Sequence, residues 1–216
     1  MRRATAACVL LMVLAGCESA PFAHEEVEAL VEPGDRAVAF IPFAGNRARG
    51  ITLVDGITLA ELAAMQLRTA RPKLAVLGPS DMRDTLRKGL NEARWHEIAR
   101  ETGATLLVVG EITFLDVHYD KMLQSREGTV GLRFRILDAA AFPPKPLAKV
   151  NWRFGFPEDV GAKFDAKYTS MDDKTFRREL LQYGAGHVAG AFYTRYVKRT
   201  VATRLDVTWR KDHPIR

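Results

Sequence analysis

TLLVVGEITFL at residues 105–115 and TVGLRFRIL at residues 129–137 set the expected architecture. The first stretch is apolar and then alternates, as a central strand does, and the second alternates throughout. The charged segment between them, 120–127, predicts that they form an antiparallel hairpin, and 149–156 would add a third strand. The side chains of the second strand that should face the core are all apolar, namely Val130, Leu132, Phe134 and Ile136.

Strand and helix patterns alternate before this hairpin, and one long helix follows it. The order predicts a single-domain α/β sandwich, with a mixed sheet and helices packed on it. The expected elements are a strand at 37–43, a helix at 57–69, a strand at 74–77, a helix at 91–102 that Gly103 ends, and a helix from Asp172 or Asp173 to about Lys198.

The amino terminus has the features of an export signal. Arg2 and Arg3 precede an apolar run at 4–14, which is shorter than the roughly 20 residues that a membrane-spanning helix needs. Leu14-Ala15-Gly16-Cys17 then matches the lipobox of bacterial lipoproteins, in which the cysteine thiol receives a diacylglycerol. We therefore expect cleavage before Cys17 and lipid on its sulfur. The alternative is an ordinary secretory signal followed by a chance cysteine.

Cysteine content agrees with a lipid anchor. Cys8 would leave with the signal peptide, so Cys17 would be the single cysteine of the mature protein and no intramolecular disulfide could form. Several acyl chains on one residue would hold the protein firmly on a membrane. In a Gram-negative cell, Glu18 after the cysteine favours transfer to the outer membrane, so the expected location is its periplasmic face.

Charge divides the chain into regions. The formal net charge of +6 falls by two, to +4, if Arg2 and Arg3 are removed. We expect a signal peptide at 1–16, an acidic lipidated tether at 17–36, the α/β domain at 37–200 and a basic tail at 201–216. A basic tail is compatible with nucleic acid, but an exported lipoprotein rarely meets any. Anionic lipid, acidic polysaccharide, a partner protein or simple solvation are the remaining interpretations.

Signatures of catalysis are weak, and we expect no catalytic, metal or cofactor site. The segment His96-Glu97-Ile98-Ala99-Arg100 has an arginine where a zinc-binding helix needs its second histidine. The glycines of 184–190 lie in a helical pattern instead of the strand-turn context of a dinucleotide site, which favours a thin helix face for close packing. His187, on the apolar stripe of the last helix, is interpreted as a core residue.

Three segments together resemble a superfamily of envelope lipoproteins: VAFIPFAGN at 38–46, ARETGATLLVVGEI at 99–112 and VGLRFRILDA at 130–139. This superfamily includes the curli-secretion lipoprotein CsgG, the amino-terminal domain of TolB, the Pel polysaccharide-export lipoprotein and the lipoprotein activators of penicillin-binding proteins. The resemblance covers roughly 37–200. The hairpin at 120–127 is short and charged, unlike the long membrane segments of the curli pore. Residues 157–175 look like an insertion, either an interaction loop or a solvated one.

The resemblance implies a non-catalytic, lipid-anchored protein that binds copies of itself or a partner in an export or cell-wall machine. A monomeric activator of a periplasmic cell-wall enzyme is the alternative, and an envelope hydrolase is a third hypothesis from another class. Arg47 and Arg49 are the candidate partner-binding residues, because two guanidinium groups in a loop after the first strand can engage carboxylates or phosphates. The competing interpretation of this loop is a solvated hinge.

Overall fold

The computed structural model describes residues 24–158 and 161–198. The predicted signal peptide, Cys17 and the basic tail at 201–216 lie outside the described residues. None of the described helices is long and apolar enough to cross a membrane.

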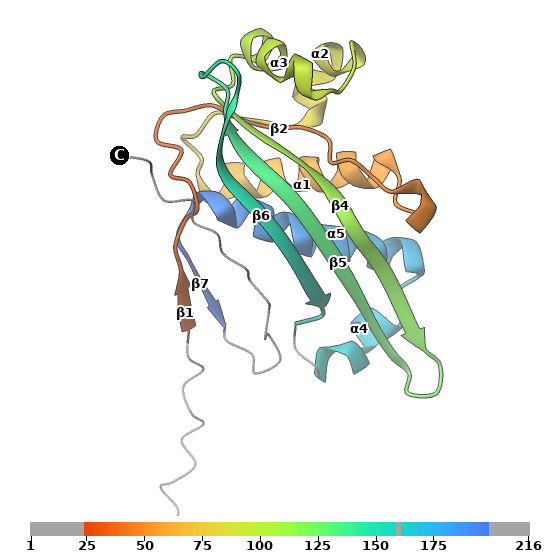
Figure 1. Cartoon of the computed structure of the whole chain (residues 1–216). Coiled ribbons are helices and arrows are strands. Elements are labelled where there is room, and N and C mark those ends of the chain that lie inside the picture. Colours follow the sequence, from red (N-terminus) through yellow and green to blue (C-terminus); the bar gives the residue numbers. More distant parts are fainter. Residues whose placement is uncertain (1–23, 159–160, 199–216) are drawn as a thin grey trace, which may run out of the picture.

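The core of the fold is a mixed five-stranded sheet in the order β3-β2-β4-β5-β6 (Figure 1). β2 runs parallel to both β3 and β4, whereas β4, β5 and β6 form an antiparallel meander. The predicted α/β class with a mixed sheet is confirmed. The strands are β2 (Val38–Phe40), β3 (Val76–Leu77), β4 (Leu106–Asp120), β5 (Ser125–Asp138) and β6 (Lys145–Phe156).

The predicted hairpin is present and longer than expected. The register pairs Leu106 with Asp138 at one end and Asp120 with Ser125 at the other, so the turn is confined to 121–124. All four predicted inward-facing side chains of β5 are buried in the main core. The far end of the hairpin was missed because its residues are mostly polar, although Ser125 and Arg126 are buried there.

Two long helices cover one face of the sheet. α1 (Leu53–Ala70) and α5 (Asp173–Ala189) lie side by side on it. The opposite face is covered at one end by α3 (Trp95–Thr102), whose Ile98 belongs to a second, smaller core cluster. The remaining helices and 3₁₀ turns are η1 (Arg47–Arg49), η2 (Pro79–Met82), α2 (Arg83–Arg87), η3 (Glu92–Arg94), η4 (Gly161–Phe164), α4 (Ala166–Thr169) and η5 (Gly190–Phe192).

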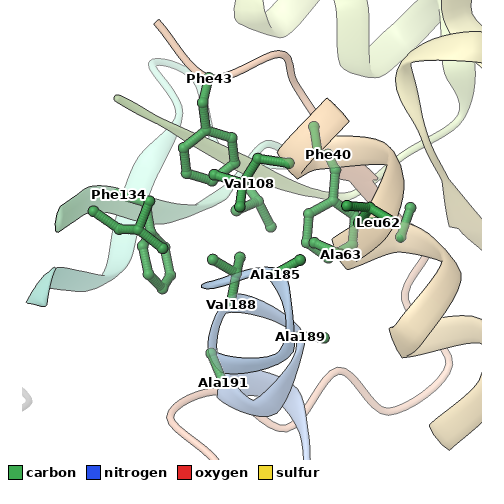
Figure 2. Packing of buried hydrophobic residues seen from close by; sticks show 14 of the residues in the cluster. Phe40, Phe43, Leu62, Ala63, Val108, Phe134, Ala185, Val188, Ala189 and Ala191 are labelled. Carbon is green, nitrogen blue, oxygen red and sulfur yellow. The ribbon is translucent and has the colours of Figure 1, made fainter. Parts of the chain in front are cut away.

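In the main core, side chains of the sheet pack against α1 and α5, and several of the helix residues are alanines (Figure 2). A Cβ atom built on Gly184 would already touch Val130 and Leu132 at 3.4 Å, so the thin helix face faces β5. Close approach of this kind raises packing density without cavities. The labelled members are Phe40, Phe43, Leu62, Ala63, Val108, Phe134, Ala185, Val188, Ala189 and Ala191.

The last helix ends earlier than predicted. α5 stops at Ala189, and β7 (Arg195–Lys198) is a strand instead of a final helical turn. β7 pairs antiparallel with β1 (His24–Val27), which belongs to the segment predicted as a tether. Leu30 then donates its backbone N–H to the Ala191 carbonyl. The chain from residue 24 onward is therefore packed on the domain, through pairing with residues about 170 positions away.

Candidate functional site

The predicted loop around Arg47 and Arg49 is a closed turn. η1 forms its centre, and Gly50 ends it with a φ of 66°, in the left-handed region that glycine adopts without strain. The Gly50 N–H donates to the Arg47 carbonyl, and the Ile51 N–H donates to the Asn46 carbonyl at 3.1 Å. These bonds give the exposed loop a defined turn conformation.

The two arginines of the turn have different roles. Arg49 donates from Nη1 to the Thr113 carbonyl of β4 at 2.9 Å, so it fastens the turn to the sheet. Arg47 is exposed. Among the described residues, no hydrogen-bond partner of its guanidinium is found. Arg47 is therefore the group free to meet a partner, and Arg49 holds the backbone that presents it.

A partly buried ion pair holds the same turn from the other side. Arg177 of α5 donates to both carboxylate oxygens of Asp55, each at 2.9 Å, and to the Gly50 carbonyl at 3.0 Å. Asp55 also accepts the Thr52 N–H at 2.7 Å, and Thr52 caps α1 in return. Burial alone would raise the pKa of Asp55, but the hydrogen bonds from Arg177 and Thr52 lower it to about 2.

Exposed apolar side chains follow the turn directly. Leu53, Val54 and Ile57 in the first turns of α1 are 53%, 69% and 37% exposed. Together with Arg47 and Arg49 they form what we call the loop–helix surface. An arginine beside exposed aliphatic groups is suited to a protein partner that offers a carboxylate and an apolar side chain.

Sequence reasoning missed the residues that brace this surface. The pattern Thr52-Leu53-Val54-Asp55 is a capping-box signal, and it could have placed the start of α1 four residues before the predicted Ile57. Nothing in the sequence links Arg177 to Asp55, because 122 positions separate them. Only the packing of α5 beside α1 brings the two together.

A separate groove of about 360 Å³ lies where the end of β6 meets α5. It combines aromatic, acidic and amide side chains with one histidine and one arginine. If the protein were the envelope hydrolase of the third hypothesis, this groove is where we would expect its active site. The lining residues are Gln66, Phe156, Glu158, Tyr168, Glu179, Gln182, Tyr183, Gly186, His187 and Arg195.

His187 at the base of the groove is a packed residue. Its ring stacks on Phe154 with centroids 3.8 Å apart, and its Nδ1 lies 2.9 Å from Arg195 Nη2. Since an arginine can only donate, Nδ1 accepts, and the ring proton lies on Nε2. Burial, with Arg195 adding to it, lowers the pKa of His187 to about 3. A neutral histidine whose Nδ1 is occupied suits packing better than proton transfer.

Two further groups of the groove, Tyr183 and Glu158, are engaged with each other. The Tyr183 hydroxyl donates to Glu158, and burial followed by that carboxylate raises the pKa of the hydroxyl. The groove lining contains no serine, threonine or cysteine. In the part of the chain that the structure describes, no three acidic, histidine or cysteine side chains cluster in a way that could hold a metal ion.

The predicted insertion at 157–175 is partly structural. Tyr168 packs against Phe156 and Phe176, with ring centroids 5.4 and 6.1 Å apart. Phe164, in contrast, is 50% exposed. The segment is therefore anchored through one aromatic residue and presents the other to solvent.

No family model matches the chain, and no curated protein is significantly similar to it in sequence. Solved structures with a similar arrangement include two PelC dodecamers from Paraburkholderia phytofirmans. One, of a variant, has a TM-score of 0.45 and 13% identity over 77% of this chain and 98% of that chain. The other has a TM-score of 0.43 and 17% identity over 80% and 99%. A lipoprotein from Neisseria meningitidis gives 0.40 and 15% over 58% and 88%.

Proposed function

We propose that this chain is a non-catalytic, lipid-anchored protein of the bacterial envelope that works by binding. Its α/β domain would face the periplasm from the outer membrane and assemble with copies of itself, as a component of an export or cell-wall machine. The observation that carries the proposal is the loop–helix surface, in which hydrogen bonds from two arginines, Arg49 and Arg177, hold an exposed arginine and exposed aliphatic side chains in a fixed geometry.

Rigidity of this surface supports a binding role. A loop that is ordered before association loses less conformational entropy when it binds, so more of the interaction energy appears as affinity. Arg177 alone connects Asp55, the Gly50 carbonyl and helix α5. Nothing in the stability of the fold requires Leu53 and Val54 to be apolar, because both face solvent.

Charge complementarity supports a second copy of the chain as the partner. Glu26 and Glu28, in and directly after β1, are exposed. In Figure 1, β1 lies at the left of the molecule and α1 begins at the right. A cationic surface and an anionic one on opposite sides fit a head-to-tail contact between copies, which generates a ring if the rotation between them closes.

The lipobox supports the anchor, and Cys17 would carry the lipid. Two groove contacts support a non-catalytic role, because Tyr183 is bonded to Glu158 and His187 to Arg195. The segments at 96–100 and 184–190 agree with this role, since neither has the pattern of a zinc or dinucleotide site. A monomeric activator docked on a cell-wall enzyme would use the same surface with a different partner. The mass of the native protein separates the two alternatives.

Co-purification tests this proposal. Two differently tagged copies would be expressed in one cell, and one tag would be used for capture. We expect the second copy to be recovered with the first, and recovery to be lost when Arg47→Glu is introduced in both copies. Arg87→Glu is the matched control, because Arg87 is an exposed arginine of α2 on a distant element.

Equal recovery of the Arg47→Glu and Arg87→Glu proteins would exclude the loop–helix surface as the assembly contact. Absence of the second copy even for the unaltered protein would favour the monomeric activator. Circular dichroism and the melting temperature check that each variant folds, and we expect neither to change, because both side chains are exposed.

A further inference from the structure

The turn between β4 and β5 presents apolar side chains to solvent. Met122 is 94% exposed and Leu123 is 64% exposed. Both lie at the tip of a hairpin whose strands are 15 and 14 residues long, so the body of the domain does not cover them. Two adjacent aliphatic side chains at such a tip have no role in the core of this chain.

Hydrogen bonds hold the tip in one conformation. The Asp120 Oδ1 accepts the backbone N–H groups of Met122 and Leu123 at 2.8 and 3.0 Å. Gln124 closes the turn with a φ of 47°, in the left-handed region. The turn therefore directs the Met122 and Leu123 side chains outward, while its polar backbone groups are satisfied from within.

The insertion extends this exposed region. Lys163 of η4 pairs with Glu127 of β5 at 3.5 Å, which places η4 beside the hairpin. Next to it, Phe164 is half exposed, with the Lys163 ammonium 5.6 Å from the centre of its ring. We call Lys121, Met122, Leu123, Lys163 and Phe164 the tip surface.

The composition of the tip surface fits a bilayer. Aliphatic and aromatic side chains flanked by lysines are typical of segments that enter the headgroup region, where apolar groups reach the acyl boundary and cations meet anionic lipid. The acids nearby are engaged within the chain, including Asp165 beside Phe164, whose carboxylate accepts the Lys167 N–H. Asp120 is engaged by backbone N–H groups, and Glu127 is paired with Lys163, which leaves the exposed Lys121 as the cation for anionic lipid.

The position of the tip fits the same bilayer. In Figure 1 the hairpin tip and the start of β1 both lie toward the lower end of the molecule. Cys17 precedes His24 by seven residues, a length of chain that spans at most about 25 Å. A lipid on Cys17 would therefore hold this end of the domain close to the membrane.

We infer that the tip surface contacts the bilayer that anchors the protein, with Met122 and Leu123 entering its headgroup region. The inference rests on the proposed anchoring at Cys17. The domain would then touch the membrane at two points, the lipid and the hairpin tip. Two contacts would fix the orientation of the domain on the membrane.

A single fluorescent label tests the inference. The full lipoprotein carrying Met122→Cys is labelled with the polarity-sensitive fluorophore NBD and reconstituted in vesicles of phosphatidylethanolamine and phosphatidylglycerol. Because Cys17 would be acylated, the new thiol would be the single reactive one. The matched control is Phe142→Cys, which is 82% exposed and lies in the β5–β6 connection at the opposite end of the sheet.

We expect the label at 122 to shift its emission to shorter wavelength on reconstitution and to be quenched by nitroxide-bearing lipids, whereas the label at 142 stays water-like. Water-like emission from both labels, in protein that floats with the vesicles, would overturn the inference and leave the anchor standing. A shift at 122 without quenching by the nitroxide lipids would mean that a second copy covers the tip, which also overturns it. Protein that does not float with the vesicles would contradict the anchor itself.

Discussion

Asp55 is the residue on which the loop–helix surface depends most. Its carboxylate joins the cap of α1 to Arg177, and it is only 8% exposed. Since its pKa is about 2 in the folded protein against 3.8 for an unperturbed aspartate, the unfolded state binds protons that the native state does not. The stabilisation is complete above about pH 4 and is lost as the pH falls through 2.

We expect Asp55→Asn to lower the free energy of unfolding by about 1–2 kcal/mol at neutral pH, because one partner of a braced pair is removed. The difference from the unaltered protein should shrink as the pH falls from 4 to 2. Urea denaturation at several pH values measures both effects, with Asp84→Asn, an exposed acid, as the control. A difference that is constant across this range would show that Asp55 does not titrate as proposed.

Gly103 offers a test of backbone strain that side-chain packing does not complicate. It ends α3 with a φ of 71°, as predicted, and a Cβ atom placed there would meet nothing within 4 Å. Gly103→Val should therefore destabilise the fold by about 1–3 kcal/mol through strain alone. Gly155→Val is the control, since Gly155 also has open space but no positive φ. Equal melting temperatures for the two variants would refute the strain argument.

At the scale of elements, helix α1 lies close to the backbone of the segment that follows β2, at Phe43. A Cβ atom on Gly56 would lie 1.8 Å from the Phe43 carbonyl oxygen, a backbone atom that has no room to move. On α5, a Cβ atom on Gly186 would meet only the side-chain oxygen of Gln66 at 2.9 Å. That side chain is partly exposed, and it can turn aside at the cost of its hydrogen bond to the Gln182 carbonyl.

Two glycine-to-alanine substitutions should therefore change the stability of the fold differently. Alanine favours a helix over glycine by about 1 kcal/mol, so Gly186→Ala should be neutral or stabilising. Gly56→Ala should cost about 2–3 kcal/mol, because α1 must move away from the sheet to relieve the overlap. Thermal unfolding of the two variants compares them directly. Stabilisation by Gly56→Ala would mean that α1 does not approach the Phe43 backbone this closely.

The sequence was most informative for elements whose pattern is local. The β4–β5 hairpin, its inward-facing residues and the Gly103 helix end could all be predicted, because alternation and a helix-stop glycine are encoded over a few residues. The start of α1 was placed too late because Leu53 and Val54 face solvent and break the amphipathic pattern. β7 was predicted as helix because its pairing with β1 is non-local.

The candidate site was predicted only in part, for the same reason. Arg47 and Arg49 lie in a loop that could be recognised from its glycines and its place after the first strand. That Arg49 is used internally, and that Arg177 holds the turn, follows from contacts across the fold. Of the exposed aliphatic residues of this surface, Ile57 was assigned to the buried face of the helix, and Leu53 and Val54 were overlooked. Residue type alone does not show whether an apolar side chain is exposed.

At the scale of the whole molecule, the account requires that lipid on Cys17 supply the membrane affinity. Cys17→Ser should release the protein into the soluble periplasmic fraction, because the tip surface alone offers only two aliphatic side chains and one aromatic ring. Cell fractionation with a salt wash measures this. Persistent recovery of the variant with membranes would indicate a second anchor or a wrong lipobox assignment.

The released Cys17→Ser protein also provides the most direct test of the central claim, that the domain works by assembling with its own copies. Its mass can be measured without detergent by size exclusion with light scattering. We predict a mass that is a multiple of that of one chain, and a fall to the mass of one chain when Arg47→Glu is added. A monomer at all concentrations would contradict self-assembly and would favour an activator that docks on another envelope protein.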